Sequence, residues 1–187
     1  MGDLAPGLAQ NLWVTAAALL ACVLLLWLLS IRLRDISIID IFWGPAFGVV
    51  ALVGYALSDG RGVELRNTLV TVLTVVWAAR LGGYLYWRNV GKGEDPRYTA
   101  AYRKRFPANL HWHTLTKVFL LQGFLVWLIS IPVQLGQYLV TPPVLGPVAI
   151  IGVGLWAIGF LFEAVADWQL ARFKGDAANR GRVLDDG

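Results

Sequence analysis

Long stretches without a charged side chain limit this chain to a membrane-embedded helical fold. No Asp, Glu, Lys or Arg occurs over residues 4–31, 41–58 or 118–162. The last of these runs is divided near its middle by Thr141-Pro142-Pro143. A helix needs about 20 apolar residues to cross a bilayer core. The composition agrees, because only 15% of the residues are charged, whereas about a quarter are charged in soluble domains. The sequence predicts an all-α, polytopic transmembrane bundle, with residues 1–187 as one integral membrane domain.

Five spans are expected, at about residues 9–31, 37–57, 67–87, 117–139 and 145–171. The third loop and the C-terminal tail are rich in Lys and Arg, and the fourth loop has no charge. Because Lys and Arg accumulate on the cytoplasmic side, the first and third loops and the tail are expected inside and the N-terminus outside. The net charge of +4 is explained by these flanking residues, so no nucleic-acid partner is expected.

The third loop has a pattern of its own. Glu94-Asp95-Pro96 is typical of a helix start, and Tyr98, Tyr102 and Phe106 recur every four residues among basic neighbours. This pattern predicts a short helix at the lipid headgroups, with simple anchoring or contact with an anionic cofactor as its alternative roles. His111-Trp112-His113 lacks a third ligand nearby, so no metal site is expected.

Asp40 is the first candidate among the ionisable residues at membrane depth, which tend to face the bundle interior and to be functional. Helical spacing places Asp40, Trp43 and Phe47 on one face, and Pro45 removes a backbone donor there. Asp40 is predicted either to cap the second span, opposing its dipole, or to act inside the bundle.

Arg80 is the second candidate. Trp77, Arg80 and Tyr84 share a face of the third span, and Arg88 continues it. Arg80 is expected to pair inside the bundle, with Asp40 or Glu163 as possible partners. Gly82-Gly83 is expected to let another helix approach closely.

The third candidate is a polar stripe at the end of an apolar helix, in the segment LFEAVADWQLARFKGD. At 100° per residue, Glu163, Asp167 and Lys174 fall within about 40° of one another. The stripe is interpreted as one wall of a polar cavity that Arg80 also lines. The alternative is that Asp167 and Lys174 lie in the interface and only Glu163 is buried.

Three segments in order resemble one family. ISIIDIFWGPAF, TVVWAARLGGYLYWRNVGKGEDPRY and LFEAVADWQLARFKGDAANRGRVLDDG are similar to bacterial membrane proteins grouped as domain of unknown function 1295, which are related to steroid 5-alpha-reductases. The resemblance implies a seven-helix enzyme of the bacterial inner membrane. The enzyme would use NADPH to reduce a carbon–carbon double bond conjugated to a ketone in a sterol- or isoprenoid-like substrate. The resemblance also implies two further spans after Gly187, so that five of the seven expected spans are present here.

The resemblance assigns roles to particular residues. Arg80 and Arg88 would bind the cofactor, with Tyr84 beside it as a catalytic candidate. Glu163, Asp167 and Lys174 would contact the nucleotide, although steroid reductases more often have Asn at the position of Glu163 and Arg at that of Lys174. Asp40 is the second catalytic candidate, and Arg97 is a further candidate for phosphate contact.

Reduction of such a double bond needs a hydride at the β-carbon and a hydrogen-bond donor at the ketone oxygen. The enolate oxygen must be stabilised, and a Tyr or a protonated carboxylic acid can donate that hydrogen bond in an apolar site. Arg and Lys suit the NADPH phosphates. Two other classes stay open: a membrane methyltransferase that uses S-adenosylmethionine, and a non-enzymatic membrane protein whose polar stripe serves helix packing.

Overall fold

The computed structural model describes residues 4–59, 61–179 and 181–184, and most of them are helical. Its described part contains no strand, only an isolated bridge between Leu4 and Leu139. The chain divides into two compact units, Met1–Val144 and Leu145–Gly187. The predicted all-α class is confirmed, whereas the single domain over residues 1–187 stays a prediction.

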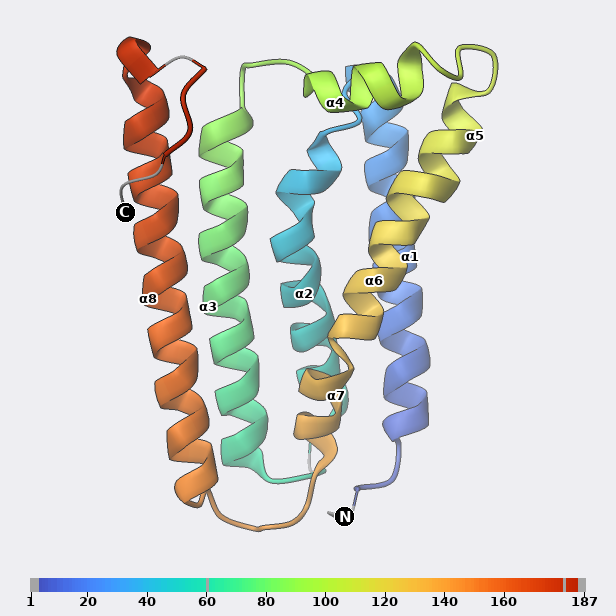
Figure 1. The fold of residues 1–187 in the computed structure, drawn as a ribbon. Helices are drawn as coiled ribbons and strands as arrows, with labels where there is room; N and C mark the ends of the chain where they lie inside the picture. The colour runs from blue at the N-terminus through green and yellow to red at the C-terminus, as the bar shows by residue number, and fades with distance from the viewer. Residues whose placement is uncertain (1–3, 60, 180, 185–187) are drawn as a thin grey trace. The chain divides into compact units, whose positions relative to one another are not determined.

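The first unit holds four candidate membrane spans. Helices α1 (Leu8–Leu33), α2 (Ile38–Leu57) and α3 (Glu64–Asn89) run alongside one another (Figure 1). The fourth span is built from α5 (Leu110–Thr114), the π-helical η2 (Leu115–Leu120), α6 (Leu121–Ile129) and α7 (Ile131–Tyr138). The second unit contains α8 (Pro147–Gly175) and the short η3 (Ala177–Asn179).

Five helices in the described chain are long and apolar enough to cross a membrane, which confirms the predicted number of spans. The fourth begins at Leu110, several residues before the predicted residue 117. Lys117 therefore lies inside this helix, and its ammonium nitrogen is 5.3 Å from the Phe106 ring centroid. With five such helices, the chain is an integral membrane protein. Its fourth span begins before the charge-free run that predicted it.

Helices α2 and α3 approach each other at backbone distance. A Cβ atom added to Gly82 would lie 2.6 Å from Pro45 Cγ, and one added to Gly44 would lie 3.1 Å from the Ala78 carbonyl oxygen. The predicted close approach is therefore confirmed at Gly82, whereas Gly83 has open space around it. The absence of side chains at Gly44 and Gly82 is what allows this contact.

An uncharged polar cluster joins four helices at the end of the unit where α1 begins and α7 ends. We name it the amide cluster, and its buried members are Asn11, Thr15, Asn67, Thr71, Gln134 and Gln137. Gln134 Oε1 accepts hydrogen bonds from Asn11 Nδ2 at 3.1 Å and Thr15 Oγ1 at 2.7 Å. Gln137 Nε2 donates to Thr71 Oγ1 at 2.9 Å and to the Ala51 carbonyl at 2.8 Å. Neutral hydrogen bonds thus connect α7 to α1, α2 and α3.

The third loop closes the other end of the unit, where α4 (Pro96–Tyr98) lies across the helix ends and leads into the π-helical η1 (Thr99–Arg103) (Figure 1). The Asp95 carboxylate caps α4 by accepting a hydrogen bond from the Arg97 amide at 2.8 Å. The predicted helix start is therefore confirmed. The Tyr98 and Tyr102 rings stack with centroids 6.3 Å apart, and their place among lipid headgroups stays a prediction.

Candidate functional site

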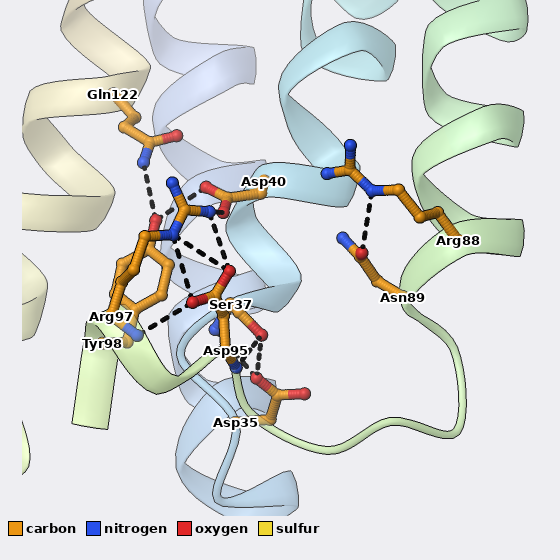
Figure 2. A network of polar contacts seen from close by, with 9 residues as sticks. All are labelled: Asp35, Ser37, Asp40, Arg88, Asn89, Asp95, Arg97, Tyr98 and Gln122. Carbon is orange, nitrogen blue, oxygen red and sulfur yellow. Dashed lines mark hydrogen bonds and ion pairs between the residues drawn. The ribbon is translucent and has the colours of Figure 1, made fainter. Parts of the chain in front are cut away.

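The polar residues at this end form one connected group, which we name the loop-3 site: Asp40, Glu94, Asp95, Arg97 and Tyr98. It forms because residues 36–40 and 94–98 run side by side in the same direction (Figure 2). Their hydrogen-bonded pairs keep a constant separation of 58 residues: Ile36–Glu94, Ser37–Asp95 and Asp40–Tyr98. The third loop is thereby held in register with the start of α2.

Tyr98 and Asp40 make the central contact of the site. The Tyr98 hydroxyl donates to Asp40 Oδ1 at 2.6 Å, and Gln122 Nε2 approaches the same hydroxyl at 3.4 Å (Figure 2). Burial, and then the hydrogen bond to Asp40, raise the pKa of Tyr98 well above its usual range. Tyr98 is therefore a neutral hydrogen-bond donor throughout the physiological pH range.

Arg97 forms the exposed rim of the site. Its guanidinium donates from Nε and Nη2 to the Asp95 carboxylate, and Nη2 lies 3.7 Å from Asp40 Oδ2. The hydrogen bonds from the Arg97 side chain and amide hold the pKa of Asp95 below its usual value. The Arg97 side chain is 75% exposed, so its remaining donors face outward and can meet an anion.

Glu94 anchors the loop to both neighbouring segments. Its carboxylate accepts from the Ile36 amide and the Thr99 hydroxyl, each at 2.8 Å, and from two nitrogens of Arg103. Burial acts to raise the pKa of Glu94, but these hydrogen bonds outweigh it and hold the pKa below its usual value. Because the carboxylate is fully engaged and its side chain only 9% exposed, Glu94 has a structural role.

The residues expected to be functional lie in different places. Asp40 is in the first turn of α2, where its carboxylate opposes the helix dipole, and it also accepts a hydrogen bond from Tyr98 of the third loop. A role inside the bundle stays a prediction. Tyr84 is on α3 beside Arg88, whose guanidinium carbon lies 5.4 Å from the Tyr84 ring centroid. Arg88 Nε donates to Asn89 Oδ1 at 3.2 Å (Figure 2). The two catalytic candidates, Asp40 and Tyr84, share no hydrogen bond in the described chain, and the tyrosine that contacts Asp40 is Tyr98.

The remaining predicted residues belong to different units. Arg80 is on α3 of the first unit, half-buried, whereas Glu163, Asp167 and Lys174 are on α8 of the second. Glu163 and Asp167 are half-buried and Lys174 is exposed. The cavity that these four residues were expected to line together stays a prediction.

Tyr98 and Gln122 were missed as site residues by sequence reasoning. Tyr98 was interpreted only as part of an anchoring stripe, and Gln122 is one amide in a long apolar run. The available signal was Gln122 itself, because a polar residue at membrane depth tends to face the bundle interior.

The fold and this site define the class of the protein: a polytopic, all-α integral membrane protein with a polar site at one end of its helices. The chain belongs to the family described as Protein of unknown function (DUF1295), whose family model matches residues 26–187. This match confirms the family-level resemblance. Searches among curated proteins and among solved structures found no significant match.

Proposed function

We propose that this protein is a membrane-embedded reductase that uses NADPH to reduce a carbon–carbon double bond conjugated to a ketone in a sterol- or isoprenoid-like lipid. The observation that carries the proposal is the neutral Tyr98 hydroxyl, held by Asp40 at the end of a membrane helix bundle. A lipid substrate reaches such a site from the bilayer, and a soluble cofactor reaches it from water. The Lys- and Arg-rich third loop favours the cytoplasm for this end.

Tyr98 supplies the hydrogen bond that the reaction needs. Negative charge develops on the ketone oxygen of an enone as its β-carbon accepts a hydride, and a positioned donor stabilises that charge. Tyr98 turns its hydroxyl from Asp40 toward the substrate oxygen, while Gln122 Nε2 stays beside the phenol oxygen. Asp40 orients the hydroxyl before substrate binds, which makes it a positioning residue.

The residues of the loop-3 end fit an anionic cofactor. Arg97 is 75% exposed, and Arg88 makes no ion pair within the described chain. Guanidinium groups are suited to phosphate oxygens because they present several donors in one plane. Arg88 and Arg97 would hold the phosphates. When bound, NADPH supplies the hydride for the β-carbon, and water supplies the proton for the α-carbon.

The test uses the purified chain in lipid nanodiscs, with NADPH oxidation and reduced lipid measured together over a panel of sterol and isoprenoid enones. We expect Tyr98→Phe to lower turnover by about a hundredfold or more while NADPH binding is retained. Tyr102→Phe is the matched control, because Tyr102 stacks on Tyr98 but has no hydrogen bond to Asp40, and it should keep normal turnover.

Three results would overturn the proposal. The first is an equal loss of turnover in the Tyr98→Phe and Tyr102→Phe variants, which would show that the Tyr98 hydroxyl has no specific role in the reaction. The second is binding of S-adenosylmethionine without binding of NADPH, which would favour a methyltransferase. The third is no binding of either cofactor by a folded protein, which would favour a non-enzymatic role.

A further inference from the structure

A cavity lies at the same end of the first unit as the loop-3 site, between the end of α1 and the start of α5. Its volume is about 390 Å³, and its lining residues are Ser30, Ile31, Arg34, Ile36, Arg103, Leu110, His111 and Thr114. Neither Asp40 nor Tyr98 lines it, so it is distinct from the centre of the loop-3 site. Because two candidate spans meet it, at Leu33 and Leu110, the cavity lies at the level where the hydrocarbon core gives way to water.

The two charged side chains that line this cavity, Arg34 and Arg103, are both basic. His111 adds an imidazole ring to the wall, and no carboxylate is among the lining residues. Arg103 is fixed from behind by Glu94, and its Nη2 donates to the Arg34 carbonyl at 2.7 Å. Arg34 is exposed and makes no ion pair in the part of the chain that the structure describes. Glu94 balances the charge of Arg103, so Arg34 is the lining cation whose charge no ion pair of the described residues neutralises.

The other half of the wall is apolar. Ile31, Ile36 and Leu110 line the cavity, and α1 and α5 each carry an exposed large apolar side chain next to a lining residue in the sequence. Leu33 on α1 is 57% exposed and Trp112 on α5 is 66% exposed. A Trp at a membrane–water boundary is typical of the headgroup level. A ligand here would meet cations on one side and hydrocarbon on the other.

We propose that this cavity binds the phosphate headgroup of an anionic phospholipid, whose acyl chains follow the exposed apolar faces of α1 and α5. Basic pockets between the ends of membrane helices recognise such headgroups. The apolar wall argues for a lipid over a free anion, because inorganic phosphate gains nothing from Ile31, Ile36 and Leu110. The inference does not depend on the proposed reductase activity.

The experiment measures lipid retention by the full chain in detergent, using native mass spectrometry with equal amounts of phosphatidylglycerol and phosphatidylcholine. We expect preferential retention of phosphatidylglycerol. Arg34→Gln and His111→Gln should each weaken it, with a loss of about fivefold for the arginine, corresponding to about 1 kcal/mol per charge. Arg32→Gln is the matched control, because Arg32 is an exposed cation at the same helix end but lies outside the cavity.

Each alternative outcome overturns the proposal in a recognisable way. Equal retention of the two lipids would show that the cavity does not select charge. Equal losses in Arg32→Gln and Arg34→Gln would show that the lipid responds to the general positive charge of this end and not to a defined site. Displacement of phosphatidylglycerol by millimolar inorganic phosphate would assign the cavity to a soluble anion. Unchanged thermal unfolding in zwitterionic detergent checks that the Arg34→Gln and His111→Gln variants are folded.

Discussion

The loop-3 site and the amide cluster both connect elements of the first unit through polar groups, but they use different kinds of side chain. The loop-3 site uses carboxylates and a guanidinium group, and Asp40 and Arg97 stay exposed to 26% and 75%, although Glu94 is only 9% exposed. The amide cluster has no charge, and Gln134 and Gln137 have 0% exposure. One end of the unit thus keeps ionised groups in contact with solvent, and the other keeps neutral groups away from it.

The difference follows from the free energy of desolvation. Burying an ion costs several kcal/mol even after relaxation, whereas an amide or hydroxyl with a hydrogen-bond partner costs far less to bury. Asp40 lies in the first turn of its helix, where water is near. At the opposite end, the amide cluster joins its helices through buried Asn, Gln and Thr side chains. The contacts of the loop-3 site therefore use charged groups, and those of the amide cluster use neutral ones.

The largest effect is expected from placing a carboxylate in the amide cluster. Gln134→Glu removes the donor that contacts Ser130 Oγ at 3.2 Å and introduces an ionisable group at 0% exposure. We expect stability to fall by several kcal/mol, measured as thermal unfolding in detergent. The control is Gln10→Glu, the same change at an exposed position beside Asn11. Similar stability in the two variants would show that this end is wetter than the comparison assumes.

The next effect concerns the anchor of the third loop. Glu94→Gln replaces the carboxylate that accepts from Arg103, Thr99 and the Ile36 amide, and hydrogen bonds to charged groups contribute about 1.5–3 kcal/mol each. We expect a loss within that range and faster proteolysis of the third loop. Glu64→Gln, an exposed carboxylate in the first turn of α3, should cost less than about 1 kcal/mol. Equal costs would remove the structural role of Glu94.

Acid should affect the two regions differently. The folded-state pKa of Glu94 lies below its ordinary value of 4.5, so its contribution is complete above that value and is lost as pH falls through the folded pKa. We expect unfolding experiments between pH 6 and pH 3 to show declining stability, with a smaller decline in Glu94→Gln. The same slope in the wild type and Glu94→Gln would assign the acid sensitivity to other carboxylates.

The smallest effect is expected from one hydroxyl of the amide cluster. Thr15→Val keeps the shape of the side chain but removes the donor to Gln134 Oε1. Hydrogen bonds between membrane helices contribute about 0.6 kcal/mol on average, and a loss of that size should appear in thermal unfolding. Thr74→Val is the control, because Thr74 donates only to the Val70 carbonyl of its own helix. A larger loss in the control would show that the interhelical bond contributes nothing.

Much of the fold could be predicted because each span is a local property of the sequence. Three charge-free runs predicted four of the spans, because Thr141-Pro142-Pro143 divides the last run. The third span was predicted from the apolar residues around Arg80, and the start of α4 from Asp95-Pro96. Asp40 was singled out because a carboxylate among apolar residues is conspicuous. Its partner Tyr98 was not, since a contact between residues 58 positions apart depends on how the third loop folds back.

The amide cluster escaped prediction for a different reason. Asn11, Thr15 and Gln134 carry no charge, so they do not interrupt the apolar runs in which they lie. The runs predicted where helices cross the membrane but not which of their faces meet. That information depends on complementary hydrogen bonds between α1 and α7, which no single segment contains.

The constant separation of 58 residues between paired groups has a consequence for local opening. The Ile36 amide donates to Glu94 and the Asp95 amide donates to Ser37, so the two segments protect each other's amide protons. Neither segment can separate from the other without exposing both sets, and they form one cooperative unit. In hydrogen–deuterium exchange, the amides of Ile36 and Asp95 should lose protection together and at one rate, and Glu94→Gln should accelerate both.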